Sequence, residues 1–347
     1  MTVQSAKTGG LSARKCEAAL HWGTQKLVVA DQAAQIDLDL FGVDLKTEGP
    51  VAAFQIKKNT DDCCVSYQIY SLARPPRLLR TITGGRFFSA SDRHLTGRIA
   101  IWTDDAAAVN GLDDLLAVEM DYLPTYVLRF EQGRMLDSSN EFQDYFNDIV
   151  MRVRAEINPV FLQEFKLSDG RLRGDLSSDF SRLHRLRIVK TQILEIVWAY
   201  LYSGREQEAW RSLTEMWPAR DVERIRLVIA NARANGILAQ IDGVSTSSAR
   251  APKNRVWIFK QSEVTPAQPI YLWRFPPASL ADRNILDTEV TLDLVIDSAG
   301  KVSSAEPAGG GADEGLMSAV KGWKFIPSMK NGHSVASQLR LITSLKR

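Results

Sequence analysis

Short segments in which apolar and polar residues alternate dominate the first part of the chain. Ile36, Leu38 and Leu40 alternate with acidic residues, and comparable runs follow one another from residue 27 to residue 136. Alternation with a period of two is typical of strands with one buried face, and polar turns separate these runs at roughly 8–12-residue intervals. The pattern predicts a β-rich part, arranged as an antiparallel sheet, a sandwich or a propeller-like piece.

The middle of the chain changes to a helical period. Apolar residues recur every three or four positions within four segments, and prolines or glycines follow them. The predicted helices span residues 141–157, 183–202, 206–216 and 221–235.

Two segments rich in small polar residues separate these periodic regions. Residues 168–179 are rich in Gly, Asp and Ser, and residues 242–255 are rich in Ser, Thr and Ala. Such compositions are typical of linkers. They predict an α+β, multidomain chain with a β-rich domain that ends in a helix (14–167), a helical hairpin domain (180–241) and a mixed α/β domain (256–347).

The last domain has the most specific pattern. Residues 290–296 alternate as a strand, and Asp297–Gly300 is a turn after which Val302 resumes the extended pattern. Residues 316–323 have helical spacing, Asn331-Gly332 is a tight turn, and residues 335–345 form a last strand. The predicted order is strand, strand, helix, strand.

This order and its residues resemble the C-terminal domain of TonB, the periplasmic energy-coupling protein. The resemblance covers about residues 270–347, and it departs from the family at Ile285-Leu286-Asp287, where a Gly often precedes the first strand. Trp323 and Phe325 are expected to be core aromatics that hold the helix on the sheet. The matching residues are Phe275-Pro276-Pro277, Asp297, Gly300, Ala319, Val320, Trp323, Phe325, Pro327, Asn331 and Gly332.

The TonB resemblance implies that the last strand pairs with a partner. An open sheet leaves backbone N–H and C=O groups unpaired at its edge, and a peptide strand can bind there by β-augmentation. The alternative expectation is that residues 256–259 or 270–273 already cover this edge within the chain. The predicted partner-binding residues are Val335, Ser337, Gln338, Leu339, Arg340, Leu341 and Thr343.

Two shorter segments have weaker resemblances. Residues 87–102 resemble one segment of an integrin-type propeller repeat, whose acidic loop binds calcium in that family. Here the loop offers only Asp92, His94, Thr96 and Gly97, so a hairpin without an ion is expected. Residues 198–213 resemble a single tetratricopeptide repeat, and without a second copy they predict only a packed helical hairpin.

Composition restricts the classes of function. The 347 residues carry a formal net charge of +2, which gives no reason to expect a nucleic-acid partner. No run approaches the roughly 18 apolar residues of a membrane helix, and no signal peptide is visible at the N-terminus.

The three cysteines do not have the spacing of a metal site. In an oxidising compartment Cys16 could bridge to Cys63 or Cys64, whereas adjacent cysteines rarely bond to each other. The sequence therefore predicts no zinc site.

Catalytic motifs are also missing from the sequence. There is no phosphate-binding loop, nucleophile elbow or zinc-protease motif, and the four histidines are scattered. The carboxylate pairs Asp61-Asp62, Asp104-Asp105 and Asp113-Asp114 are expected to be solvated loop residues. We therefore expect no catalytic residue, no cofactor and no metal.

Three hypotheses of function remain from the sequence. The first, based on the TonB resemblance, is a non-enzymatic periplasmic protein that binds a protein or peptide strand and is linked to outer-membrane transport. The second is a structural or scaffolding protein that self-associates, for example as a homodimer, through the same domain. The third, with the least support, is a secreted enzyme that uses the N-terminal β domain.

Overall fold

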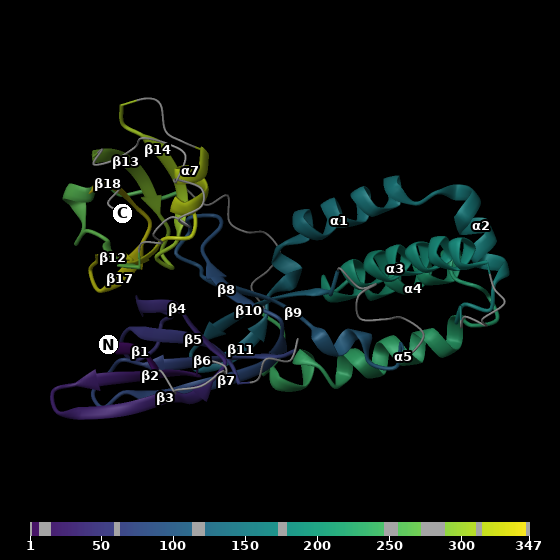
Figure 1. Ribbon diagram of the computed structural model, residues 1–347, viewed down its shortest axis with the longest axis horizontal. Coiled ribbons are helices and arrows are strands. Elements are labelled where there is room, and N and C mark those ends of the chain that lie inside the picture. The colour runs from purple at the N-terminus through teal and green to yellow at the C-terminus, as the bar shows by residue number, and fades with distance from the viewer. Residues whose placement is uncertain are drawn as a thin grey trace.

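The computed structural model describes residues 2–6, 15–58, 63–112, 122–172, 179–245, 256–271, 289–309 and 314–344. It shows a β-rich N-terminal part, an arm of helices and a small C-terminal α/β part that lies beside the β-rich sheets (Figure 1). The predicted α+β, multidomain class with a β-rich N-terminus is confirmed.

The N-terminal part consists of three antiparallel sheets. The first has the order β1-β2-β3, the second is the meander β4-β5-β6-β7, and the third has the order β11-β10-β9-β8. Strand β1 pairs with β2, so the strands begin before residue 14, where the sequence predicted the first domain to start. The strands are β1 (Thr2–Ala6), β2 (Lys15–Trp22), β3 (Gln25–Ala33), β4 (Gln35–Val43), β5 (Val51–Lys57), β6 (Val65–Ser71), β7 (Arg77–Gly85), β8 (Phe88–Ser91), β9 (Ala100–Asp104), β10 (Thr125–Glu131) and β11 (Arg134–Asp137).

The helical arm contains one more helix than the sequence predicted. The sequence interpretation used Asn158-Pro159 only as the end of the first helix. The same two residues start the next one, because the Asn158 side chain accepts from the N–H of Val160 and Pro159 occupies the first turn. The main helices are α1 (Gln143–Glu156), α2 (Pro159–Leu167), α3 (Phe180–Tyr202), α4 (Glu206–Met216) and α5 (Val222–Ala234).

One apolar core joins the sheets β4-β5-β6-β7 and β11-β10-β9-β8 to this arm, whereas the sheet β1-β2-β3 packs in a separate cluster. Leu128 on β10, Phe146 on α1 and Ile193 on α3 are fully buried in one cluster, which continues to Ile237. The predicted domain boundary near 168–179 stays a prediction. Because the core contains residues from both sides of this boundary, a chain cut there would keep its two sides packed together.

The C-terminal part is built around a three-stranded antiparallel sheet with the order β14-β13-β18. Helix α7 covers it through Leu316 and Val320. Smaller pairs form between β12 and β15 and between β16 and β17. The elements are β12 (Gln268–Tyr271), β13 (Glu289–Ile296), β14 (Val302–Pro307), α7 (Glu314–Val320), β15 (Lys324–Ile326), β16 (Ser328–Lys330), β17 (His333–Val335) and β18 (Ser337–Ser344).

The aromatic pair and the Asn-Gly turn of the last part have the local structure that the sequence predicted. Trp323 and Phe325 are almost completely buried in the core of this part. Asn331 and Gly332 both have positive φ, at 52° and 81°, which matches a tight turn between β16 and β17. Phe275-Pro276-Pro277 and Ile285-Leu286-Asp287 lie outside the described residues.

The predicted bridge from Cys16 is wrong. Cys63 and Cys64 form a disulfide with each other, and Cys16 has a free thiol. Cys16 belongs to β2, where it pairs with Ala33 and its Sγ lies 3.9 Å from the carbonyl oxygen of Ala34. The adjacent cysteines instead precede β6 in a different sheet, and alternation alone could not assign these segments to separate sheets.

Candidate functional site

Two segments that the sequence singled out separately meet in the structure. The N–H of Asp92, in the loop between β8 and β9, donates to Oδ2 of Asp297 at 2.8 Å. The hydroxyl of Ser298 donates to Oδ2 of Asp92 at 2.9 Å. The carboxylate of Asp92 also accepts from the N–H groups of Thr96 and Gly97, at 3.0 and 2.6 Å. Residues 87–102 thus form a hairpin, as predicted, and its loop docks on the turn Asp297–Gly300.

Asp297 is the acceptor at the centre of this contact. Its Oδ1 accepts from the N–H groups of Ala299 and Lys301, at 2.9 and 2.8 Å, and its side chain is buried. Burial raises the pKa of Asp297 to about 6, with a further increase from Asp92, although the backbone donors and Lys301 favour the charged form.

A buried ion pair lies beside the docked turn. Nζ of Lys301 is 2.5 Å from Oδ1 of Asp39 and 2.7 Å from its carbonyl oxygen. The other oxygen of Asp39 accepts from the hydroxyl of Tyr67 at 2.7 Å and from the N–H of Ala90 at 2.9 Å. All of these groups are satisfied, as a buried charged pair requires.

Two further acidic residues, Asp37 on β4 and Asp44 directly after it, contact the C-terminal part. Lys324 on β15 contacts both carboxylate oxygens of Asp37 at 2.8 Å. His333 on β17 lies 2.8 Å from Asp44, whose N–H donates to Ser334 at 2.7 Å. Basic groups of the C-terminal part therefore face a row of carboxylates on and just after β4.

The titration of Asp297 gives a testable pH dependence. Its pKa rises from 3.8 to about 6 on folding, so the folded state binds the proton more tightly. The contribution of Asp297 to the free energy of unfolding is therefore fully present below about pH 4. It is lost, by roughly 3 kcal/mol, as the pH rises through 6. We expect wild type to lose free energy of unfolding over this range relative to Asp297→Asn, as measured by urea unfolding at each pH.

The difference between the two proteins isolates Asp297 from the other carboxylates. The charged groups that face it are Asp92 and Lys301, and both remain in the variant. A difference curve that stays flat, or that rises with pH, would contradict the assignment.

The predicted partner-binding strand, β18, is the edge of its sheet, but part of its outer side is covered. The N–H of Phe259 donates to the carbonyl of Ala336 at 3.1 Å, and the N–H of Gln338 donates to the carbonyl of Phe259 at 2.9 Å. The N–H of Arg340 lies 3.4 Å from the side chain of Gln261. The alternative expectation, that residues 256–259 cover this edge, therefore holds for the first half of the strand.

The second half of β18 is open. Because Gln338 points its N–H outward, the alternation of an antiparallel ladder turns the N–H and C=O of Ile342 outward as well. Among the described residues, no backbone group pairs with Ile342 on that side. The predicted partner-binding residues did not include Ile342. In the structure Ile342 is 64% exposed.

The seven predicted residues separate into different environments. Leu339 is a core residue, Leu341 packs against the core, and Ser337 is buried with its hydroxyl 2.5 Å from that of Ser328. Gln338 and Arg340 are exposed, and Arg340 forms a two-pronged ion pair with Asp293. Thr343 is half-buried. Val335 lies outside the strand, in a groove next to it.

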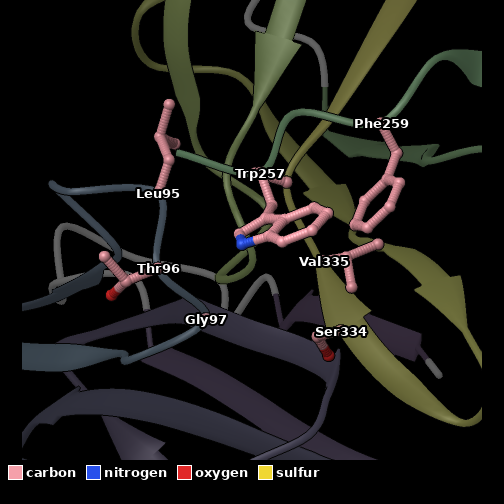
Figure 2. Close-up of a pocket in the computed structure, with 8 residues that line it drawn as sticks. Leu95, Thr96, Gly97, Trp257, Phe259, Ser334 and Val335 are labelled. Carbon is pink, nitrogen blue, oxygen red and sulfur yellow. The ribbon is translucent and has the colours of Figure 1, made fainter. Parts of the chain in front are cut away.

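This groove lies between the β8–β9 loop and the C-terminal part. It has a volume of about 370 Å³. Figure 2 shows the indole of Trp257 between the loop that carries Leu95 and the ring of Phe259. The lining residues are Leu95, Thr96, Gly97, Trp257, Phe259, Ser334, Val335 and Ala336.

The expectation that paired loop carboxylates are solvated is wrong for Asp104-Asp105. Asp104 is buried and binds Arg86 at 2.6 Å, and Asp105 accepts from the hydroxyl of Tyr202 at 2.9 Å. A Cβ on Gly236 would lie 2.5 Å from Oδ1 of Asp105, so the chain approaches this carboxylate closely at Gly236. Asp61-Asp62 and Asp113-Asp114 lie outside the described residues.

The described residues show neither a metal site nor a membrane-spanning helix. They contain no group of three or more His, Cys, Asp or Glu side chains that could hold a metal ion. None of their helices is both long enough and apolar enough to cross a membrane.

Comparisons with protein-family models, with curated proteins and with solved structures found no match to this chain. The geometry of the strand edge and of the groove therefore carries the functional argument.

Proposed function

We propose that this chain is a non-enzymatic periplasmic interaction protein that binds a peptide strand at the open half of β18. The observation that supports this most directly is the outward-facing backbone of Ile342, which has no partner among the described residues. An added strand gains main-chain hydrogen bonds there with little demand on its sequence. The TonB-like residues of the same unit favour the periplasm and a link to outer-membrane transport.

The flanking side chains suit such an edge. Arg340 and its partner Asp293 keep the outer face polar, which opposes indiscriminate sheet growth. Ile342 offers an exposed apolar side chain for cross-strand packing. A second copy of the chain could use the same edge, so self-association is the competing outcome.

The test compares Ile342→Pro with Ile342→Ala in the full chain. Proline removes only an outward N–H, so the ladder to β13 is kept, whereas alanine removes the side chain and keeps the donor. A phage-displayed random peptide library selected on wild type supplies the binding peptides. We expect proline to weaken their binding about tenfold, or roughly 1.4 kcal/mol, and alanine to weaken it less.

Circular dichroism and urea unfolding establish that both variants are folded. Equal binding by wild type and a folded Ile342→Pro variant would contradict strand addition. Sedimentation without peptide tests the competing outcome, because dimers lost only in the proline variant would indicate self-association at this edge.

A further inference from the structure

The apolar groove adjoins the proposed strand-binding edge. Val335 and Ala336 line the groove and immediately precede β18, and Phe259 both lines the groove and bonds to Ala336 and Gln338. Its volume of about 370 Å³ is within the usual range of ligand sites, and it exceeds what a single aromatic side chain requires. The groove therefore lies at one end of β18, and Phe259 and Gln261 separate it from the open half of the edge.

The segment beside the groove exposes an unusual amount of apolar surface. Val256 and Trp257 are each 57% exposed and Ile258 is 38% exposed, in three consecutive positions. Clustered exposed apolar residues with a Trp among them are typical of protein interaction sites. The Trp257 and Phe259 rings are stacked with centroids 6.2 Å apart, which leaves an aromatic surface toward the groove.

One lysine contacts the Phe259 ring and a second follows it in the chain, whereas the carboxylates of Asp92 and Asp44 near the groove are already bonded within the chain. Nζ of Lys330 lies 3.8 Å from the centroid of the Phe259 ring, and Lys260, the next residue in the chain after Phe259, is exposed. Among the residues that the structure describes, neither ammonium group has a carboxylate partner within ion-pair distance. An acidic group of a partner could therefore form an ion pair with one of these ammonium groups.

The covered part of β18 sets the spacing of such a partner. Phe259 occupies the edge at Ala336–Gln338 and the side chain of Gln261 lies at the N–H of Arg340, so an added strand finds free backbone groups from Ile342 onward. Ile342 is six positions from Ala336, which is about 20 Å of extended chain. A side chain that reaches the groove must therefore come from about six residues beyond the ladder.

We propose that the groove binds an aromatic side chain of the partner peptide, with an acidic residue of that peptide placed at Lys330. The peptide pairs with β18 near Ile342, leaves the sheet where Phe259 blocks it, and inserts the aromatic ring beside Trp257. This inference rests on the proposed function, because the same peptide occupies both the edge and the groove.

Peptides from the library selected on wild type test this directly. We expect them to share an aromatic residue and an acidic residue beside a short extended stretch. Trp257→Ala should weaken their binding at least tenfold, and Lys330→Glu should weaken it several-fold at low salt and less at high salt. Leu227→Ala is the matched control, because Leu227 is 64% exposed on α5 and lies outside the groove.

The outcomes separate the groove from the strand edge. Binding that is sensitive to Ile342→Pro but not to Trp257→Ala would overturn the groove proposal and keep strand addition. Binding that is sensitive to Trp257→Ala but not to Ile342→Pro would keep an aromatic groove and overturn strand addition. If no peptide is enriched and the chain instead forms dimers that Trp257→Ala abolishes, the occupant is a second copy and the peptide proposal is wrong.

Discussion

Gly300→Ala is expected to be among the most damaging single substitutions in the C-terminal part. Gly300 has φ of +78°, and a Cβ there would lie 2.0 Å from the carbonyl oxygen of Phe325. The obstacle is backbone, and it cannot rotate away, because the N–H of Phe325 donates to the carbonyl of Gly300 at 2.9 Å. We expect the φ penalty of about 1–2 kcal/mol and a steric cost of about 1–3 kcal/mol to add.

Urea unfolding of the full chain measures this loss, and Gly332→Ala is its matched control. Gly332 has nearly the same φ, +81°, but a Cβ there would meet no atom within 4 Å. It should therefore cost only the φ penalty of about 1–2 kcal/mol. Equal losses for the two variants would show that the close approach of Gly300 to Phe325 is absent.

Asp39→Ala is expected to cost about 3–5 kcal/mol, because it removes the acceptor at the centre of the interface between the two parts. Three donors lose the carboxylate at once: the hydroxyl of Tyr67, the N–H of Ala90 and the ammonium of Lys301, which keeps only the carbonyl oxygen of residue 39. The side chains of Asp39 and Lys301 are only 3% and 17% exposed, so water cannot readily replace the lost contacts. Chemical unfolding of the full chain gives the value.

Two further variants serve as comparisons for Asp39→Ala. Glu48→Ala breaks the surface pair with Arg77, whose side chains are 89% and 66% exposed, and should cost about 0–1 kcal/mol. Lys301→Met should cost less than Asp39→Ala, because Asp39 keeps the Tyr67 and Ala90 donors. An Asp39→Ala variant within about 1 kcal/mol of wild type would contradict the buried network.

Local periodicity explains why much of the fold could be predicted. The strands from β4 to β11, the helices α1, α3, α4 and α5, and β13, β14, α7 and β18 of the last part coincide with segments of clear alternation or helical period, whereas the short strands β15, β16 and β17 were not predicted. Helix α2 was missed because it is short and starts at an Asn-Pro pair that also ends α1. Strand β1 was missed because its pairing with β2 is not visible in five residues of mixed polarity.

The arrangement of the parts could not be predicted in the same way. Asp92 and Asp297 are 205 residues apart in the chain, and neither motif alone indicates that it docks on the other. The cysteine pairing failed for a related reason, because residue spacing does not say which segments share a sheet.

The candidate site shows the same division. The sequence predicted the last strand as the edge strand, but its partner-binding residues included both Leu339, which lies in the core, and Arg340, which is exposed. It offered residues 256–259 only as one alternative cover of this edge, since the contact of Phe259 with the first half joins segments far apart in sequence. In β18 the backbone N–H groups of alternate residues point away from β13. Only the observed register shows that Ile342, and not Leu341, is one of these residues.

Amide hydrogen exchange at the edge of β18, with and without a library-selected peptide, tests strand addition most directly. The N–H of Leu341 faces β13 and should be protected in both states, whereas the N–H of Ile342 faces outward and should exchange rapidly in the free chain. The account predicts that bound peptide slows exchange at Ile342 at least tenfold and leaves Leu341 nearly unchanged. Unchanged exchange at Ile342 in a chain saturated with peptide would contradict it.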